Sequence, residues 1–388
     1  MAVDSHLRFT LALHRAAAAG GVDACFSPYS AASALGLVSR AARGRTADEL
    51  LALLAGTSEG TGTGEGTATG NGTGEATTTT TAAADLEPHA RVLREAAILN
   101  DEAAILAVAN TLWASDLITV EDSFRTELEA WPGSKTETAP FSPDPEAARE
   151  LINTDVRRTT RGLIPELLPP GSLDTDTRAS IVNALYLKTA WRFPFPEGAT
   201  APAAFHGPGG SRDVPTMHLQ ETVGYQQADG WQVVTLNAVG GVQAVVLLPD
   251  GDLEPAEAAL DEHRLAALIE GTRRQKVRLA LPKISLDVRT DLDSALKSLG
   301  VREMFQPDAD LTGLTATKPF WVDSVLHQAV LRVDEQGLEG AAATAITMRT
   351  LSLDMSEPVD VQVDRPFLLL VRHAGTGAVY FFARVVRP

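Results

Sequence analysis

The stretch that decides the fold reads Val333-Asp-Glu-Gln-Gly337-Leu-Glu-Gly-Ala341-Ala-Ala-Thr344, and residues 361–369, Val-Gln-Val-Asp-Arg-Pro-Phe-Leu-Leu, follow it near the C-terminus. Between them, residues 335–363 carry little secondary-structure signal. Loops longer than about 12–15 residues are uncommon and are usually functional or disordered. A flexible surface loop is the simplest interpretation, because Gly337 and the β-branched residues after it oppose a helix.

Written as an extended strand, this segment has two different faces. Residues 338, 340, 342, 344, 346 and 348 fall on one face, and all are uncharged and small or apolar. Residues 339, 341, 343 and 345 fall on the other face. The first face suits a sheet whose inner side is buried. An exposed loop that can become a central strand indicates a conformational switch driven by strand addition.

Composition and charge exclude several classes of function. The 388 residues are 44% hydrophobic and 21% charged, with a formal net charge of −17. Nucleic-acid binding needs a basic face, and anionic membranes attract basic segments, so neither partner is expected. No apolar run approaches the roughly 18 residues of a membrane span.

The single cysteine and the N-terminus bear on the compartment. Cys25 excludes an intramolecular disulfide, and we expect it to be buried as a small hydrophobic residue. Residues 1–8 lack a basic region followed by an apolar one, so no signal peptide is predicted. Residues 7–19 are instead predicted to form an amphipathic helix. We therefore expect a cytoplasmic protein, with export by an unrecognised route as the alternative.

The first third of the chain has a helical pattern. Ser27-Pro28 is a typical helix start, and Thr46-Ala-Asp-Glu49 has the form of a capping box. Residues 56–81 are almost entirely Gly, Thr and Glu. A tract of this kind buries too little apolar surface to offset its ordering entropy, so we predict a disordered surface insertion over residues 56–85.

From residue 105 onward strands and helices alternate irregularly. Residues 218–248 alternate with turn signals between them, as in an antiparallel region. The other predicted strands are residues 106–113, 179–188, 276–281, 320–333, 367–371 and 378–386, and the predicted helices are 145–160, 255–270 and 291–299. This mixture, without regular βαβ repeats, predicts the α+β class.

No sequence motif indicates an enzyme. Gly-X-Ser-X-Gly, His-Glu-X-X-His and the phosphate-loop Gly-X-X-X-X-Gly-Lys are all absent. The eight histidines are scattered, so neither a metal site nor a cofactor is expected. A hydrolase is therefore the weakest hypothesis.

The stretch from residue 335 to residue 344 resembles the serpin hinge, Glu-X-Gly-Thr-Glu-Ala-Ala-Ala-Ala-Thr, and residues 361–369 resemble the C-terminal motif of the same family. Further matches run in the family's order at residues 26–30, 44–46, 109–110, 152–153, 160–164, 182–191, 281–283, 291–292 and 327. The resemblance, closest to prokaryotic-type members, implies one serpin domain over residues 5–388. It also implies three β-sheets with a large central sheet A, eight to nine helices and an exposed reactive-centre loop. The 56–85 insertion then lies between helices C and D, and residues 335–358 form the hinge and loop.

The resemblance implies a suicide substrate of serine endopeptidases. Counting from the hinge Glu335 places the reactive bond at Leu351–Ser352, the P1 and P1′ residues. Leucine at P1 favours chymotrypsin-like or subtilisin-like targets, and Arg349 is the alternative P1 for trypsin-like ones. The cut loop would then insert into sheet A and trap the acyl-enzyme, a covalent complex with the target protease.

The resemblance also assigns roles to three groups of residues. The hinge group comprises Glu335, Gly337, Leu338, Glu339, Gly340, Ala341, Ala342, Ala343 and Thr344. The shutter group, Ser27, Ser30, Asn183 and His327, is implied to control opening of the sheet. The breach group, Trp191, Lys283 and Glu335, is implied to lie where the loop first enters, with Glu335 and Lys283 forming an ion pair there. Residues 87–94 lack the basic cluster of heparin-activated members, so no heparin site is evident, and a monomer is expected.

Three departures from the family pattern leave an alternative open. Leu338 stands at P14, where the family usually has Thr or Ser, and Gly340 stands at P12 instead of Ala. Ala383 replaces a frequent Gly, which is interpreted as a packing variation. A bulky residue at P14 is expected to slow insertion. The alternative is therefore a non-inhibitory serpin that acts as a binding or chaperone-like module.

Overall fold

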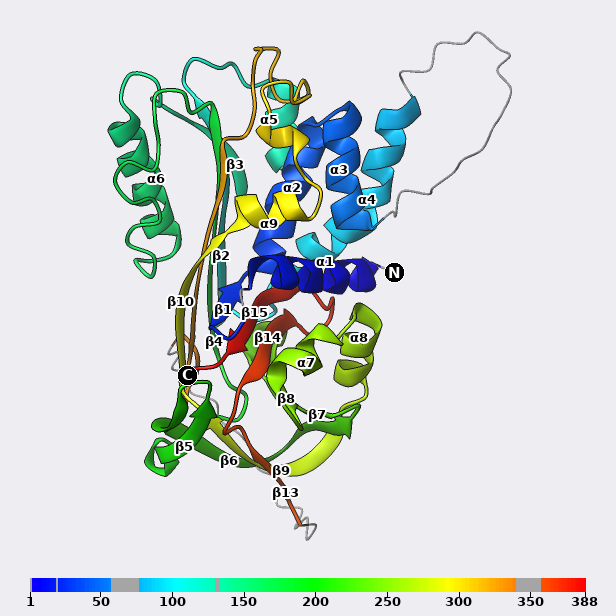
Figure 1. The fold of residues 1–388 in the computed structure, drawn as a ribbon, viewed down its shortest axis with the longest axis vertical. Helices are drawn as coiled ribbons and strands as arrows, with labels where there is room; N and C mark the ends of the chain where they lie inside the picture. The colour runs from blue at the N-terminus through cyan, green and yellow to red at the C-terminus, as the bar shows by residue number, and fades with distance from the viewer. Residues whose placement is uncertain (1, 19, 57–76, 130–132, 340–356) are drawn as a thin grey trace, which may run out of the picture.

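A computed structural model describes residues 2–18, 20–56, 77–129, 133–339 and 357–388 of the chain. Most of the predicted reactive loop and of the Gly/Thr tract therefore lies outside the described residues. In Figure 1 the first four helices of the chain gather on one side of a long sheet together with the helices of residues 122–129 and 292–298, and the helix of residues 145–159 lies on its other side. A second, curved sheet lies in the lower half of the molecule in this view. Within the described residues, no helix is long and apolar enough to cross a membrane.

The four gathered helices are α1 (Ala2–Ala17), α2 (Pro28–Ala41), α3 (Gly44–Ala55) and α4 (Thr77–Ala96). As predicted, α2 starts at Ser27-Pro28, because the Ser27 side chain accepts a hydrogen bond from the Ser30 N–H at 3.2 Å. Nearly all of α2 is buried. The amphipathic helix predicted for residues 7–19 belongs to the longer α1.

Two predictions in this region are corrected. The capping box at Thr46 does not form, because α3 already begins at Gly44. The Glu49 carboxylate instead accepts hydrogen bonds from the Arg302 and Glu303 N–H groups at 2.7 and 2.8 Å. The backbone is helical from Thr77, so the last part of the segment predicted as disordered, 77–85, is helix. The alanines that precede Leu86 are strong helix formers and extend the helix towards the N-terminus.

The six-stranded sheet has the order β10-β11-β12-β4-β2-β3. Its strands are β10 (Ile284–Asp291), β11 (Ser324–Val333), β12 (Gly337–Leu338), β4 (Ala179–Ala190), β2 (Ile105–Ser115) and β3 (Ser134–Ala139). One face packs on α2 in the main core. The other face packs on α6 (Pro145–Thr159) through a smaller cluster that includes Trp113, Phe141 and Ile152. This sheet corresponds to the expected sheet A.

The nine-stranded sheet has the order β1-β15-β14-β8-β7-β6-β9-β13, with β5 paired to β6. Its strands are β1 (Ala24–Phe26), β5 (Ala201–Gly207), β6 (Gly210–Ala228), β7 (Trp231–Asn237), β8 (Val242–Pro249), β9 (Arg273–Pro282), β13 (Val359–Gln362), β14 (Phe367–His373) and β15 (Val379–Val385). The long strand β6 pairs with β5 through its first part and with β7 through its last part. It thereby joins the two smaller expected sheets into one hydrogen-bonded sheet.

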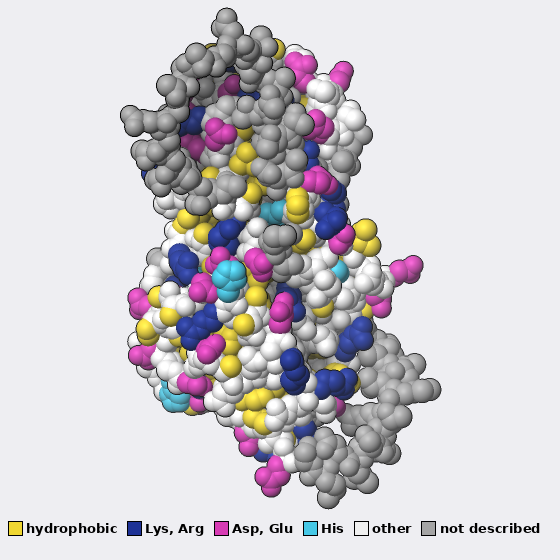
Figure 2. Space-filling model, turned by 90° about the vertical axis from the view of Figure 1, so that its right-hand side faces the viewer, with side chains coloured by type: hydrophobic (Ala, Val, Ile, Leu, Met, Phe, Trp, Pro, Cys, Tyr) yellow, Lys and Arg dark blue, Asp and Glu magenta, His cyan; other side chains and the backbone are white. Residues whose placement is uncertain are grey.

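The remaining helices are α5 (Asp122–Glu129), α7 (Leu253–Ala258), α8 (Glu262–Glu270) and α9 (Leu292–Ser298), which gives nine α-helices in the described part. The predicted helix 255–270 is thus two helices, because Asp261 caps the start of α8. Strand β10 was not predicted. In Figure 2, basic and acidic side chains are interspersed on the face shown.

Candidate functional site

The seam between strands β11 and β4 has a closed end and a hinge end. At the closed end the two strands pair directly and in parallel, from Ser324↔Ser180 to Gln328↔Ala184. At the hinge end, strand β12 lies between them. Its Leu338 is opposite Val333 on β11 and opposite Thr189 on β4. The first residues of the predicted hinge are therefore already part of the sheet.

The hinge sequence fits this position closely. Leu338 is 1% exposed and packs in the main core, so the sheet accommodates the bulky residue that the sequence presented as an obstacle to insertion. A Cβ atom at Gly337 would lie 2.1 Å from the Thr189 carbonyl oxygen. Glycine at position 337 is therefore a steric requirement, because no side chain fits between the backbones there.

A tight turn delivers the chain to β12. The Asp334 carboxylate accepts hydrogen bonds from the Gln336 and Gly337 N–H groups at 2.9 and 3.1 Å. The Trp191 indole N–H donates to the Asp334 carbonyl at 2.8 Å, and the Trp191 backbone N–H donates to the Gln336 carbonyl at 2.9 Å. The buried Trp191 of the predicted breach group thus holds the turn with two hydrogen bonds, one from its side chain and one from its backbone.

The ion pair predicted in the breach group is present. Lys283 Nζ lies 2.7 Å from Glu335 Oε2, and the Thr200 hydroxyl donates to Glu335 Oε1 at 2.7 Å. Burial alone would raise the pKa of Glu335, but the hydrogen bonds from Lys283 and Thr200 outweigh it and hold the pKa below its usual value. Thr200 was not predicted from the sequence. The Glu335 side chain is 9% exposed, so these partners anchor the start of the hinge.

The predicted shutter residues meet at the closed end in one buried network. His327 Nε2 accepts a hydrogen bond from the Ser27 N–H at 2.9 Å, so the ring proton lies on Nδ1, which donates to Asn183 Oδ1 at 2.6 Å. Asn183 Nδ2 and the Ser30 hydroxyl both donate to Asn110 Oδ1, at 2.6 and 3.1 Å. Burial lowers the pKa of His327 to about 4, so the ring is neutral near pH 7.

Sequence reasoning missed one member of this network. The dipeptide Ala109-Asn110 was noted only as a family match, and Asn110 received no role. Its carboxamide lies at the centre of the polar cluster because β2 pairs with β4 in the register Asn110↔Asn183. Only strand pairing could have revealed this contact.

Other predicted site residues cannot be placed. The hinge residues Gly340, Ala341, Ala342, Ala343 and Thr344, the alternative P1 residue Arg349 and the reactive bond Leu351–Ser352 all lie outside the described residues. Glu335, Gly337, Leu338 and Glu339 are described. The roles of all these residues remain predictions.

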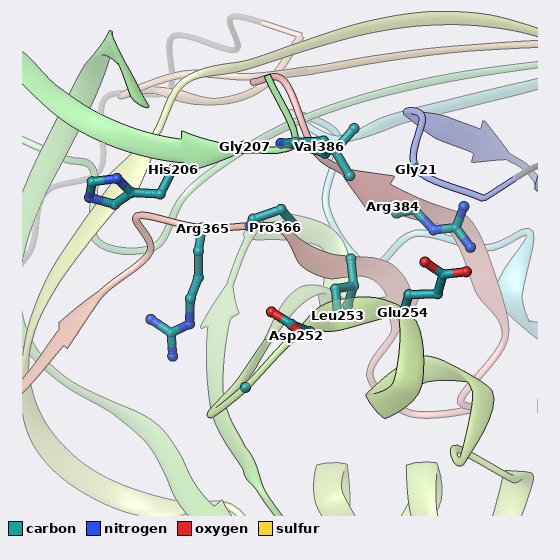
Figure 3. A pocket seen from close by; sticks show the side chains of 12 residues that line it. Gly21, His206, Gly207, Asp252, Leu253, Glu254, Arg365, Pro366, Arg384 and Val386 are labelled. Carbon is teal, nitrogen blue, oxygen red and sulfur yellow. The ribbon is translucent and has the colours of Figure 1, made fainter. Parts of the chain in front are cut away.

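One pocket with a mainly apolar lining lies away from the seam. It has a volume of about 410 Å³, and Leu253, Pro366 and Val386 project into its middle (Figure 3). Its two arginines already have partners. Arg365 donates to the Pro249 carbonyl, and Arg384 pairs with Glu257. None of the predicted site residues lines this pocket.

Comparisons with known proteins agree with the resemblance seen in the sequence. The family model Serpin (serine protease inhibitor) matches residues 4–388. The chain is 30% identical to Serpin-Z2A of Oryza sativa subsp. japonica, over 94% of this chain and 91% of that protein. It is also 30% identical to Alpha-1-antiproteinase 2 of Equus caballus, over 98% of this chain and 85% of that protein. The crystal structure of human thyroxine-binding globulin in complex with thyroxine has a similar fold, with a TM-score of 0.84, 23% identity, and coverage of 100% of this chain and 98% of that one.

Proposed function

The chain belongs to the serpin family, whose members are mostly protease inhibitors and not catalysts, and on that premise we propose that it inhibits serine endopeptidases as a suicide substrate. The observation that carries the proposal is strand β12. The sheet receives Gly337 and Leu338 as a strand between β11 and β4, so its seam already accepts residues of the reactive loop.

The proposed reaction begins as ordinary proteolysis. The catalytic serine hydroxyl of the target attacks the Leu351 carbonyl, and its proton is passed to the amine of Ser352, which leaves as the new N-terminus. The product is an ester between the protease and Leu351. Hydrolysis of this ester would complete an ordinary cleavage.

Insertion competes with that hydrolysis. The severed loop extends β12 along the seam and separates β11 from β4 at the closed end. About fifteen residues at about 3.3 Å each span roughly 50 Å, so the tethered protease is carried along the length of the sheet. Distortion of its catalytic site then prevents deacylation. The intact fold must be metastable for this step to proceed downhill.

The site supports the proposal through its two polar clusters. The breach group holds the hinge at the point of entry, where Glu335 pairs with Lys283. The shutter group spans the seam farther along, since His327 on β11 contacts Asn183 on β4. Insertion of a strand must break this second contact, so the network sets a barrier to spontaneous opening.

The test is incubation with chymotrypsin, subtilisin and trypsin, followed by denaturing gels. The expected result is a denaturant-stable complex with chymotrypsin or subtilisin and cleavage after Leu351. A complex with trypsin alone would move P1 to Arg349. Complete cleavage without a complex, and without a gain in thermal stability, would contradict inhibition and favour a non-inhibitory binding or chaperone-like serpin.

A further inference from the structure

The chain leaves the sheet abruptly after Leu338. Glu339 has a φ of 56°, in the left-handed region that costs most residues other than glycine free energy. Its N–H donates to the Arg332 carbonyl at 3.1 Å. Its Oε1 lies 3.3 Å from Arg332 Nη1, and its side chain is 19% exposed. A specific contact on β11 therefore holds the residue that directly follows β12.

Basic side chains share the face of the sheet on which Glu339 meets Arg332. Even-numbered residues of β11 and β4 face α6, as shown by Val330 and Ala184 in the cluster beneath that helix. Arg332 and Lys188 share this face by strand alternation. Arg161 lies over the Tyr186 ring on the same face, 5.7 Å from its centroid. Burial and then the Glu339 carboxylate raise the pKa of Tyr186, which agrees with the position of Glu339 beside that ring.

The strand registers show why two of these cations matter. If the parallel pairing of the closed end continued, Arg332 would lie opposite Lys188, four residues beyond Gln328↔Ala184. Like charges directly opposite each other on neighbouring strands are destabilising. The seam therefore cannot close at its hinge end without bringing two cations together.

In the hinge, Glu339 carries a negative charge at the strand position that faces both cations. Extending the registers of β12 by one residue sets Glu339 opposite Arg332 on β11 and opposite Lys188 on β4. The carboxylate then lies between the two cations and neutralises their repulsion. In the resting structure only the pair with Arg332 is formed within the described chain, because Glu339 still has its left-handed backbone.

We propose that Arg332, Lys188 and Glu339 form a charge gate, in which the two cations keep the hinge end of the seam open and Glu339 is the loop residue that they draw in. These are positioning residues for loop insertion. Their part in trapping a protease rests on the proposed inhibitory function. Their part in holding β12 does not.

The first experiment measures hydrogen exchange of the Leu338 amide in the uncut, full-length chain. E339K and R332E each break the one ion pair, so exchange is expected to accelerate about tenfold or more. The fully charge-swapped triple variant K188E/R332E/E339R, which reverses both cations and the carboxylate, should restore slow exchange to within about threefold. The matched control is E357K, which makes the same charge change at an exposed residue close to the C-terminal end of the loop and should leave exchange unchanged.

Some results would overturn the gate. Unchanged exchange in E339K would mean that burial of Leu338 alone holds the hinge. A triple variant that exchanges as fast as the single variants would mean that the charges act only by disturbing the fold.

A second measurement concerns the inhibitory reaction. With chymotrypsin, E339K should leave the rate of cleavage of the loop unchanged or faster, while the number of inhibitor molecules consumed for each protease trapped rises several-fold. K188E/R332E/E339R should bring that ratio back. If no variant or wild-type chain forms a complex, the proposed function fails, whereas the exchange results still decide the gate.

Discussion

The seam between β11 and β4 is closed by neutral groups at one end and held open by charged groups at the other. At the closed end, His327, Asn183 and Asn110 form a buried network with no formal charge near pH 7. At the hinge end, Glu335 and Glu339 pair with Lys283 and Arg332, whose side chains are 40% and 53% exposed.

The difference between the two ends explains how one sheet can resist opening and yet accept a strand. Buried hydrogen bonds are costly to break, because each leaves an unsatisfied group away from water. Partly exposed ion pairs contribute little and exchange partners readily. The closed end therefore carries most of the barrier, and the hinge end selects what enters.

The largest expected effect concerns pH at the closed end. The folded-state pKa of His327, about 4, lies below the unfolded value of about 6.5, so the unfolded chain binds its proton first as pH falls. The free energy of unfolding is therefore unaffected by this residue above pH 6.5. It should fall by about 3 kcal/mol between pH 6.5 and pH 4, because each pKa unit is worth about 1.4 kcal/mol.

The matched variant is His327→Gln, because a glutamine can accept from Ser27 and donate to Asn183 while remaining uncharged. His6, His14 and His89 also have pKa values lowered by burial, but they contribute the same pH dependence to the wild-type protein and to the variant. The free energy of unfolding of the wild-type protein, measured in urea, should exceed that of the variant most at pH 7, and this difference should shrink or reverse near pH 4.5. Parallel pH profiles would show that His327 does not titrate in this way.

At the hinge end, a steric clash should displace strand β12 without destabilising the rest of the fold. Gly337→Ala places a Cβ atom against the Thr189 carbonyl, where only 2.1 Å is available, so β12 should leave the sheet. Overpacking of this kind costs about 1–3 kcal/mol, which here destabilises the inserted hinge and not the whole fold. Hydrogen exchange of the Leu338 amide should accelerate at least tenfold, while the urea midpoint changes little.

Gly209→Ala provides the control for that substitution, because the new methyl group would meet no atom within 4 Å. Slow exchange at Leu338 in Gly337→Ala would mean that the two backbones can separate to admit a side chain.

The closed end was easier to predict from the sequence than the hinge end. Ser27, Ser30, Asn183 and His327 follow from family resemblance, and the structure brings all four into one network. Asn110 did not follow, since its place depends on the register of β2 against β4. The ion pair of Glu335 with Lys283 was predicted in the same way and is present.

The sequence could not predict which hinge residues join the sheet, because this depends on a balance between the free energy of strand pairing and the conformational entropy of the loop. Leu338 shows this clearly. As a sequence departure it was expected to hinder insertion, yet burial of its side chain stabilises the inserted position. The opposition of Arg332 and Lys188 likewise appears only when the register of β11 against β4 is known. Propensity and motif carry no information on cross-strand register.

The smallest expected effect is that of Lys283→Gln at the breach. Because Lys283 Nζ is on a side chain that is 40% exposed, the ion pair should contribute less than about 1 kcal/mol to the free energy of unfolding. Glu335 keeps its hydrogen bond from Thr200, so its carboxylate is not stranded. The urea midpoint should therefore barely move, whereas conversion to a loop-inserted or polymeric form at about 45 °C, followed on native gels, should proceed a few-fold faster. Lys276→Gln, on strand β9, which ends just before Lys283, removes the same charge away from Glu335 and should convert at the wild-type rate. If Lys283→Gln lowers stability as much as acidification of the closed end does, the contrast between the two ends of the seam is wrong.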